Sequence, residues 1–562
     1  MRLRTLMCRR SSATQGERPV CPSVPLQVRA RSANRRSVVV WAVAAIGTAA
    51  CAVVGSTALA GATTSTTSLI AAGQPGARTV RTHPAAFLDN ASFGRRQQAL
   101  AFGSGRPLRT GFLDPSAFGG PNANRSVLRA RRAGATLVRL MLAWKAVAPV
   151  PPADPENPED PAYQWRSIDQ QVADAVRGGL DPLIYVSASA PWAHGAAVGL
   201  PGTWPSPARF ADFAQATARR YSGTFIPTGA TAALPRVRLW QVWNEPNAGR
   251  ELAPQRVRGR SVSPAQYRRM VNAFADAVHG VSASNLVVAG GLGPFGHDSK
   301  DIQVVAPMRF MSILLCVSLK APHRKTCSQR THFDVWSHHP YSNGGPTWHA
   351  HSPNDASIGD LPEMRALLIA AERAGTITSA RAPKFWVTEF SWDTRPPDPH
   401  GVPSGLHARW VAEALYRMWQ AGASAVIWFR LQDDLLRQSP YQSGFFTAAG
   451  KAKHSLEAFR FPFVALRAGS AMTVWGRTPL GEGGSVVVER QSGKNWISIA
   501  RIRADRNGIF ARSLSAQAAT ALRARLVSSS ETSIPFSLTV PPDRPSTPFG
   551  CGGPIPCRAR ST

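Results

Sequence analysis

Lysine is scarce in this chain, and sequence signatures of nucleic-acid binding are missing from it. Only 8 of the 65 Lys and Arg residues are lysine, although the formal net charge is +32. The arginines are spread along the whole chain, and no RNA-binding or helix-turn-helix pattern accompanies them. We therefore expect no nucleic-acid partner. We interpret the charge as a solvated surface, with attraction to an acidic polysaccharide or an anionic envelope surface as the alternative.

Signatures of nucleotide and metal sites are missing as well. A Gly-rich phosphate loop usually follows the first strand of an open nucleotide-binding sheet, and GFLDPSAFGG is no such pattern. His323 lies between two cysteines in CVSLKAPHRKTC, but no second CxxC or HxxxH pair accompanies it. The sequence thus predicts neither a cofactor nor a metal ion.

Cysteine is rare, with seven residues in the chain, and its distribution favours an exported protein. Three cysteines lie before residue 62, and the other four form two local pairs. Even numbers of cysteines at short spacing are typical of small disulfide loops in exported chains. We therefore expect disulfide bonds between Cys316 and Cys327 and between Cys551 and Cys557.

The first 62 residues have the pattern of a targeting segment. Residues 1–37 are basic and polar, whereas residues 38–62 carry no charge and are rich in Ala, Gly, Ser and Thr. This pattern is typical of a secretory signal with a long basic front. The apolar stretch is also long enough to be a single N-terminal membrane anchor. Both interpretations place the bulk of the chain outside the cytoplasm, either secreted or membrane-anchored.

Eight short apolar runs alternate with amphipathic helical patterns between residues 106 and 466. Patterns such as RSIDQQVADAVRGG and ARWVAEALYRMWQAG separate the runs, which is typical of strands in a parallel sheet. Eight such units predict an α/β fold, the (β/α)8 TIM barrel, with an open doubly wound sheet as the alternative. The runs are residues 107–113, 135–142, 181–188, 237–243, 285–291, 333–339, 384–390 and 425–431.

The pattern differs on both sides of the predicted barrel. Residues 63–105 are rich in Ser, Thr, Ala and Gly and indicate a linker. Within residues 467–540, segments such as SVVVERQ and WISIARIRA alternate apolar with polar side chains between turn-like SGKN and DRNG. This alternation predicts a small antiparallel β-sandwich domain, for which we expect a packing or spacing role. Residues 541–562 form a Pro-rich tail with the second Cys pair.

Two glutamates mark the ends of the predicted fourth and seventh strands. Glu245 follows the Trp-rich run LWQVW, which Pro246 terminates because proline cannot continue a central ladder. Glu389 lies in WVTEFSW. The C-terminal ends of barrel strands carry the active residues of TIM-barrel enzymes, so we expect the two carboxylates to meet. Glycoside hydrolysis needs such a pair, with one carboxyl protonated and the other ionised.

Other polar and aromatic side chains fall at the ends of the same strands. A nearby arginine or tyrosine hydroxyl would keep Glu389 ionised, and repulsion from ionised Glu389 would raise the pKa of Glu245. Exposed tryptophans at this edge would stack on sugar rings, although a single tryptophan is as often a loop anchor. The candidates are Arg139, Trp192, Asn244, His339, Tyr341 and Trp428.

The strings WNEPN and TEFSW, together with Trp428, resemble the motifs of clan A glycoside hydrolases, which are retaining (β/α)8 enzymes. VWNEPN and the trailing β-sandwich are most similar to glycoside hydrolase family 39, with family 5-like cellulases next. The resemblance implies that Glu245 is the general acid/base and Glu389 the nucleophile. It also implies a hydrogen bond from Asn244 to the sugar 2-hydroxyl, orientation of Glu389 by Arg139, His339 and Tyr341, and a subsite floored by Trp428.

The functional expectation from these residues is an exported retaining glycosidase that acts on a β-linked oligo- or polysaccharide. The alternative is a polysaccharide-binding or envelope-associated protein that has the same barrel without turnover. The sequence does not predict the identity of the sugar or the choice between internal and terminal cleavage.

Overall fold

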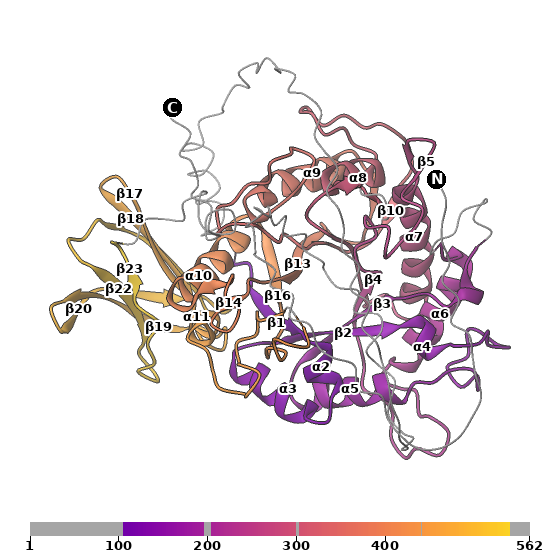
Figure 1. Cartoon of the computed structure of the whole chain (residues 1–562), viewed down its shortest axis with the longest axis horizontal. Helices are drawn as coiled ribbons and strands as arrows, with labels where there is room; N and C mark the ends of the chain where they lie inside the picture. The colour runs from indigo at the N-terminus through magenta and orange to yellow at the C-terminus, as the bar shows by residue number, and fades with distance from the viewer. Residues whose placement is uncertain (1–104, 196–203, 299–302, 440, 540–562) are drawn as a thin grey trace, which may run out of the picture. The chain divides into compact units, whose positions relative to one another are not determined.

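The computed structural model describes residues 105–195, 204–298, 303–439 and 441–539 (Figure 1). The predicted leader, most of the linker, the C-terminal tail and the Cys551–Cys557 pair lie outside these residues. Within the described residues, none of the helices is both long enough and apolar enough to cross a membrane. Cys316 and Cys327 form the first of the two expected disulfides, with their Cα atoms 5.2 Å apart.

Eight parallel strands close into a barrel, which confirms the predicted TIM-barrel fold (Figure 1). Each strand pairs with its two neighbours, and β1 closes the ring by pairing with both β2 and β16. The strands are β1 (Arg109–Leu113), β2 (Leu137–Ala143), β3 (Asp181–Ser187), β4 (Leu239–Val242), β7 (Leu286–Leu292), β11 (Val335–His338), β13 (Lys384–Phe390) and β16 (Ala423–Phe429).

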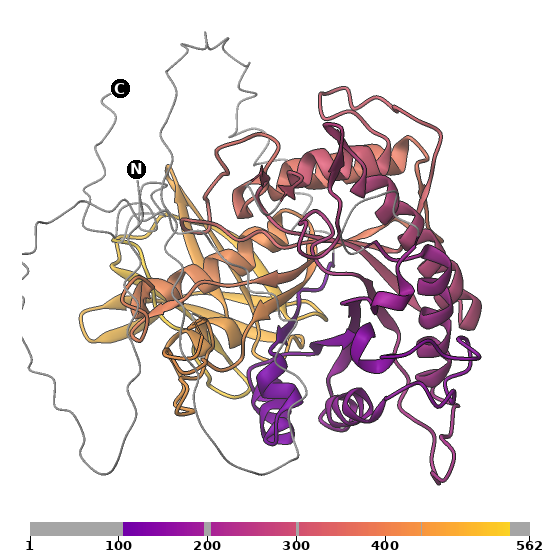
Figure 2. The same cartoon turned by 45° about the vertical axis from the view of Figure 1, so that its right-hand side comes forward.

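Helices surround this ring and cover it with amphipathic faces (Figures 1 and 2). In α5, for example, the buried residues Ile168, Val172 and Ala175 recur at the spacing of one helical face. The helices are α2 (Pro115–Gly119), α3 (Ala123–Arg132), α4 (Trp144–Val147), α5 (Arg166–Arg177), α6 (Pro207–Arg220), α7 (Ser263–Val281), α8 (Pro307–Leu315), α9 (Leu361–Arg373), α10 (Ser404–Gln420) and α11 (Ser455–Arg460), with 3-10 turns η1 (Pro191–Ala193) and η2 (Ile358–Asp360).

Four pairs of two-residue strands lie in the loops that connect the barrel elements. They order long connections without adding strands to the barrel. The pairs are β5 (Arg256–Val257) with β6 (Arg260–Ser261), β8 (His297–Asp298) with β9 (Gln303–Val304), β10 (Thr331–His332) with β12 (Ile377–Thr378), and β14 (Thr394–Arg395) with β15 (Val402–Pro403).

Two antiparallel sheets come after the barrel in the chain and confirm the predicted β-sandwich. The sequence pattern did not predict β17 and β18, and β17 begins at Phe463, so the first sandwich strand crosses the boundary expected at residues 466–467. One sheet has the order β17 (Phe463–Ala468), β18 (Ala471–Arg477), β21 (Ile509–Ser515). The other has the order β20 (Asn495–Ala504), β19 (Gly484–Ser492), β22 (Ala521–Leu526), β23 (Phe536–Ser537).

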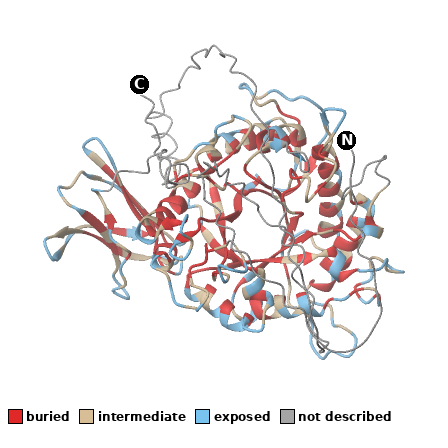
Figure 3. Cartoon of the chain, viewed as in Figure 1, coloured by how far each residue is buried: buried red, intermediate tan, exposed pale blue. Residues whose placement is uncertain are grey.

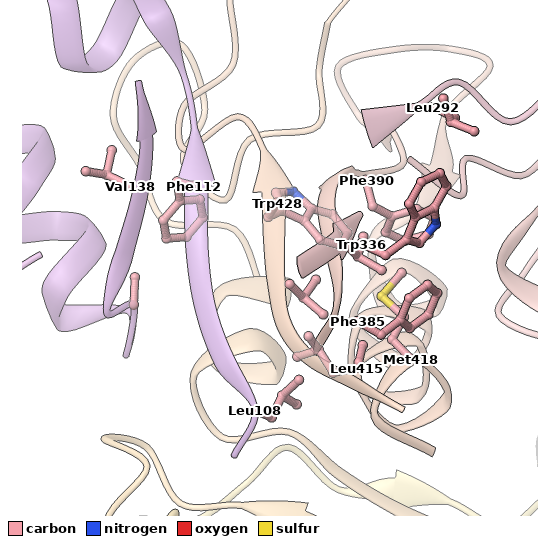
Figure 4. Packing of buried hydrophobic residues seen from close by; sticks show 14 of the residues in the cluster. Leu108, Phe112, Val138, Leu292, Trp336, Phe385, Phe390, Leu415, Met418 and Trp428 are labelled. Atoms are coloured by element: carbon pink, nitrogen blue, oxygen red, sulfur yellow. The ribbon is translucent and has the colours of Figure 1, made fainter. Parts of the chain in front are cut away.

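Buried tryptophans form much of the core. Figure 3 shows that the barrel strands and the inner faces of the helices are buried, and Figure 4 shows aromatic side chains such as Phe112, Phe390 and Trp428 packed in the interior. The same core continues into the sandwich, where the fully buried Trp475 of β18 lies with its ring 5.6 Å from that of Trp419 on α10. The sandwich therefore shares apolar contacts with a barrel helix.

We expect Trp475→Ala to lower the free energy of unfolding by about 3–5 kcal/mol, because it leaves a cavity between β18 and α10. Trp496→Ala is the matched control, since Trp496 on β20 is only partly buried and lies under Arg523; its expected cost is about 1 kcal/mol or less. Urea unfolding followed by near-ultraviolet circular dichroism measures both. Equal stability of the two variants would show that the Trp475 contact contributes nothing to the fold.

Candidate active site

Glu245 is positioned by a short, strained segment that follows β4. The φ angles of Trp243 and Glu245 are +64° and +38°, a left-handed conformation that is unusual for residues with side chains. The surrounding structure holds both residues in place. The Glu245 amide donates to the carbonyl of Gly291 at 3.0 Å, and the Trp243 indole donates to the carbonyl of Glu251 at 3.0 Å. Such strain persists only where the neighbouring contacts over-determine it, as they do at functional sites.

The second asparagine of the WNEPN string fixes the same segment to the residues that follow β7 and β9. The Asn247 side chain is fully buried, and its amide group donates to the carbonyls of Gly293 and Val305 at 3.2 and 3.0 Å. Its oxygen accepts from the Gly293 amide at 2.9 Å. Asn247 was not among the predicted site residues, and its contacts give it a structural role in holding Glu245 at the end of its strand.

The two predicted carboxylates lie together inside the barrel. Glu245 is 1% exposed and Glu389, on β13, is 3% exposed. A carboxylate oxygen of each lies within 4.8 Å of one from the other. Retaining glycosidases have carboxyl groups about 5–5.5 Å apart, whereas inverting ones need about 6.5–9.5 Å to admit a water molecule. These two oxygens therefore lie closer together than the carboxyl groups of inverting enzymes do.

Glu389 is held by two hydrogen-bond donors. Arg139 donates to Oε2 at 2.8 Å and Tyr341 donates to Oε1 at 2.9 Å. The Arg139 guanidinium is itself fixed, because it also donates to Asn244 and Gln241 at 2.8 and 2.9 Å. Burial and the neighbouring Glu389 raise the pKa of Tyr341 well above its ordinary value, so its hydroxyl stays protonated as a donor.

Glu245 has partners that differ from those predicted. His339 Nδ1 lies 3.2 Å from Oε1, and Arg250 forms an ion pair with Oε2. Burial acts to raise the pKa of Glu245, but the hydrogen bond from His339 and the charge of Arg250 together lower it to about 2. The prediction that the pKa of Glu245 is raised is therefore wrong for this arrangement, because that argument considered repulsion from Glu389 without Arg250.

His339 also has a different contact from the one expected. Its Nε2 lies 3.2 Å from the hydroxyl of Thr388, and its other nitrogen is hydrogen-bonded to Glu245. Its predicted contribution to orienting Glu389 is wrong, because its two nitrogens contact Glu245 and Thr388. Arg250 lies five residues after Glu245 in NEPNAGRE, and only its position in the loop after strand four could have indicated it from sequence.

The two candidate tryptophans lie in packed surroundings. Trp428 on β16 is 1% exposed, stacks on Phe445 with ring centroids 4.9 Å apart, and donates to the carbonyl of Ser443 at 2.8 Å. Trp192 in η1 is partly buried and donates to the carbonyl of Ala148 at 2.9 Å, as a loop anchor does. A sugar contact at either ring stays a prediction.

A metal ion is poorly suited to this site. Glu245, His339 and Glu389 present atoms within 4.8 Å of one another, which is a spacing that metal ligands can adopt. Two guanidinium groups, those of Arg139 and Arg250, already pair with the two carboxylates. A cation placed between the carboxylates would face both positive charges, so the arrangement fits acid–base and nucleophilic chemistry better.

Comparison with known proteins gives only distant relatives. No protein-family model and no curated sequence matches the chain. Among solved structures it is similar to a family 39 glycoside hydrolase from Bacteroides cellulosilyticus WH2, with 17% identity and a TM-score of 0.45 over 73% of this chain and 80% of that one. Other similar structures are glycoside hydrolases as well.

Two of these further structures have comparable similarity. One is a GH39 enzyme from Xanthomonas axonopodis pv. citri, at 13% identity and a TM-score of 0.43 over 73% of this chain and 91% of that chain. The other is a monomeric beta-xylosidase from Caulobacter crescentus CB15, at 14% identity and a TM-score of 0.42 over 74% and 96%. These similarities concern the fold.

We expect the ionised Glu245 to contribute to stability in a pH-dependent way. Its pKa of about 2 lies below the ordinary 4.5, so its contribution is complete above pH 4.5 and is lost as the pH falls toward 2. Between about pH 5.5 and pH 3, the wild type should lose roughly 2 kcal/mol more unfolding free energy than Glu245→Gln.

Urea unfolding at the two pH values measures this difference. Glu457→Gln on α11 is the matched control, because the Glu457 side chain is 54% exposed. The control should follow the wild type. Parallel pH dependence of Glu245→Gln and the wild type would contradict the depressed pKa.

Proposed function

We propose that this chain is an exported retaining glycoside hydrolase that cleaves β-linked oligo- or polysaccharides. The observation that supports it best is the buried pair of Glu245 and Glu389, with oxygens within 4.8 Å of one another at the ends of β4 and β13. The asymmetry of the pair supports a division of labour. Arg139 and Tyr341 both donate to Glu389 and hold it in place as the nucleophile, whereas His339 and Arg250 contact Glu245.

The first step of the proposed reaction forms a bond between Glu389 and the sugar. A Glu389 oxygen attacks the anomeric carbon, the bond from that carbon to the leaving oxygen breaks, and protonated Glu245 gives its proton to the leaving oxygen. In the second step Glu245 takes a proton from water, the water oxygen attacks the anomeric carbon, and Glu389 is released as a carboxylate. Glu245 is then protonated again and ready for the next turnover.

Asn244 has a contact that suits its expected role. Its oxygen accepts from Arg139 at 2.8 Å, which fixes the amide plane beside the carboxylate pair. Because that oxygen already accepts from Arg139, the NH2 group is the part of the amide that can donate to a substrate hydroxyl. We assign this donation to the sugar 2-hydroxyl. The same arginine therefore positions both Asn244 and Glu389.

The proposed location outside the cytoplasm rests on two features. Residues 1–37 are basic and residues 38–62 are uncharged, as in a signal segment or a membrane anchor. The Cys316–Cys327 disulfide agrees with an oxidising compartment.

A second candidate function is favoured by one contact. The ion pair from Arg250 to Glu245 keeps the proposed acid ionised, and an ionised carboxyl cannot donate a proton. A non-catalytic polysaccharide-binding protein on the same barrel would tolerate this pair permanently. Turnover separates the two candidates, since only the enzyme depends on the protonation of Glu245.

We expect Glu389→Gln to lower the hydrolysis of aryl glycosides by roughly 10⁴-fold or more, because the amide cannot form the covalent intermediate. Glu245→Ala should lower kcat by about 10²–10⁴-fold on substrates with poor leaving groups. Azide should partly restore this variant by attacking the intermediate without a general base. The exposed Glu457→Gln is the control and should keep wild-type rates. Hydrolysis that survives in Glu389→Gln would exclude the proposed nucleophile.

A further inference from the structure

Arg250 approaches the proposed general acid from the solvent side. The Arg250 side chain is 24% exposed, whereas the Glu245 side chain is 2% exposed. Its Nη2 pairs with Oε2 of Glu245, and its Nε lies 3.7 Å from Oε1 of Glu251. One guanidinium is therefore shared between the buried carboxylate of the site and a neighbouring carboxylate at its edge.

The two oxygens of Glu245 differ in how firmly they are occupied. The partner of Oε1 is His339, a fully buried residue at the end of β11 that is itself hydrogen-bonded to Thr388. The partner of Oε2 is the partly exposed Arg250. A general acid must present one oxygen within hydrogen-bond reach of the leaving oxygen. Oε2 is the oxygen that can be released, and Arg250 is the group that must leave it.

Glu251 is placed to receive the guanidinium. Its backbone is fixed, because its amide donates to the carbonyl of Ala248 at 3.0 Å and its carbonyl accepts from the Trp243 indole at 3.0 Å. Burial and the negative charge of Glu245 raise the pKa of Glu251 to about 7. A close ion pair with Arg250 would stabilise the ionised form of Glu251, which burial and the charge of Glu245 otherwise disfavour.

We propose that Arg250 is a displaceable latch on Glu245, which releases the general acid by moving to Glu251 when the leaving-group side of a substrate enters. The inference rests on the proposed function and adds to it a positioning residue that controls the protonation of the acid. The exchange conserves charge. As the guanidinium moves, Glu251 loses a proton to solvent and pairs with Arg250, while Oε2 of Glu245 takes a proton from solvent.

Other charged and titratable groups near Glu245 keep their partners in this exchange. The contacts of these groups do not change, so Arg250 is the one side chain that moves in the proposed exchange. These groups are Arg139 on β2, Tyr185 on β3, His338 and His339 at the end of β11, Tyr341 in the following loop, and Glu389 on β13.

The test compares the pH dependence of kcat/KM on two aryl glycosides. A phenyl glycoside needs a proton on its leaving oxygen, whereas a 2,4-dinitrophenyl glycoside leaves without one. In Arg250→Gln the alkaline limb for the phenyl glycoside should move up by about 1–3 pH units, because a guanidinium lowers a nearby carboxyl pKa by that amount. The alkaline limb for the dinitrophenyl glycoside should stay where it is in the wild type.

Three further variants separate a latch from a general structural effect. Arg260→Gln carries the same change at an exposed position of β6 and should leave both profiles as in the wild type. Glu251→Gln removes the receiving carboxylate, so it should lower kcat/KM for the phenyl glycoside more than for the dinitrophenyl glycoside. The double variant of Arg250→Gln and Glu251→Gln should match Arg250→Gln alone. An unchanged phenyl profile in Arg250→Gln, or an equal shift on both substrates, would overturn the latch.

A second measurement tests the latch independently of the proposed glycosidase activity. If the wild type hydrolyses no glycoside, the proposed function fails, and the latch is tested by carbon-13 NMR of labelled glutamate carboxyls. Glu245→Gln assigns the signal. In Arg250→Gln, the Glu245 signal should titrate about 1–3 pH units higher than in the wild type. An unchanged titration would overturn the latch without reference to activity.

Discussion

The balance of charge inside the barrel is the constraint on which the site depends. Two carboxylates that are 1% and 3% exposed lie with oxygens within 4.8 Å of one another, where water cannot screen their repulsion. Each carboxylate has its own guanidinium, Arg139 for Glu389 and Arg250 for Glu245. The two ion pairs differ in exposure to solvent, because the Arg139 side chain is buried and the Arg250 side chain is partly exposed. The proposed reaction needs this difference, since a nucleophilic carboxylate must be ionised and a general acid must carry a proton.

The barrel delivers this arrangement from three of its strands. Glu389 lies near the end of β13, Asn244 and Glu245 follow β4, and Arg139 reaches them from within β2. The backbone is left-handed at Trp243 and Glu245, beside Glu389, and Asn247 and the Trp243 indole hold that conformation. The Trp-rich run before Glu245 is therefore part of the site's support as well as part of the core.

Features that depend on strand ends could be predicted from the sequence, whereas features that depend on side-chain reach could not. The eight strands were recognisable because each is a short apolar run bounded by turns, and Tyr341 contacts Glu389 because it follows β11, which neighbours β13. Arg139 was expected at the end of its strand, but it is the third residue of β2 and reaches Glu389 from a strand that is not next to β13. The direction of the His339 imidazole and the reach of Arg250 across the loop depend on rotamers that no sequence pattern encodes. The depressed pKa of Glu245 was missed for the same reason. In the sandwich, β17 was missed because the predicted boundary passed through it.

The proposed retaining reaction is tested most directly by finding which residue carries a trapped covalent intermediate. The full chain is incubated with a panel of activated 2-deoxy-2-fluoro glycosides, and the labelled peptide is located by mass spectrometry. We expect one sugar per chain, attached to Glu389, with the label absent from Glu389→Gln. Attachment to another residue, or hydrolysis that yields the inverted anomer without any adduct, would contradict the central claim that this buried carboxylate pair works by the retaining route.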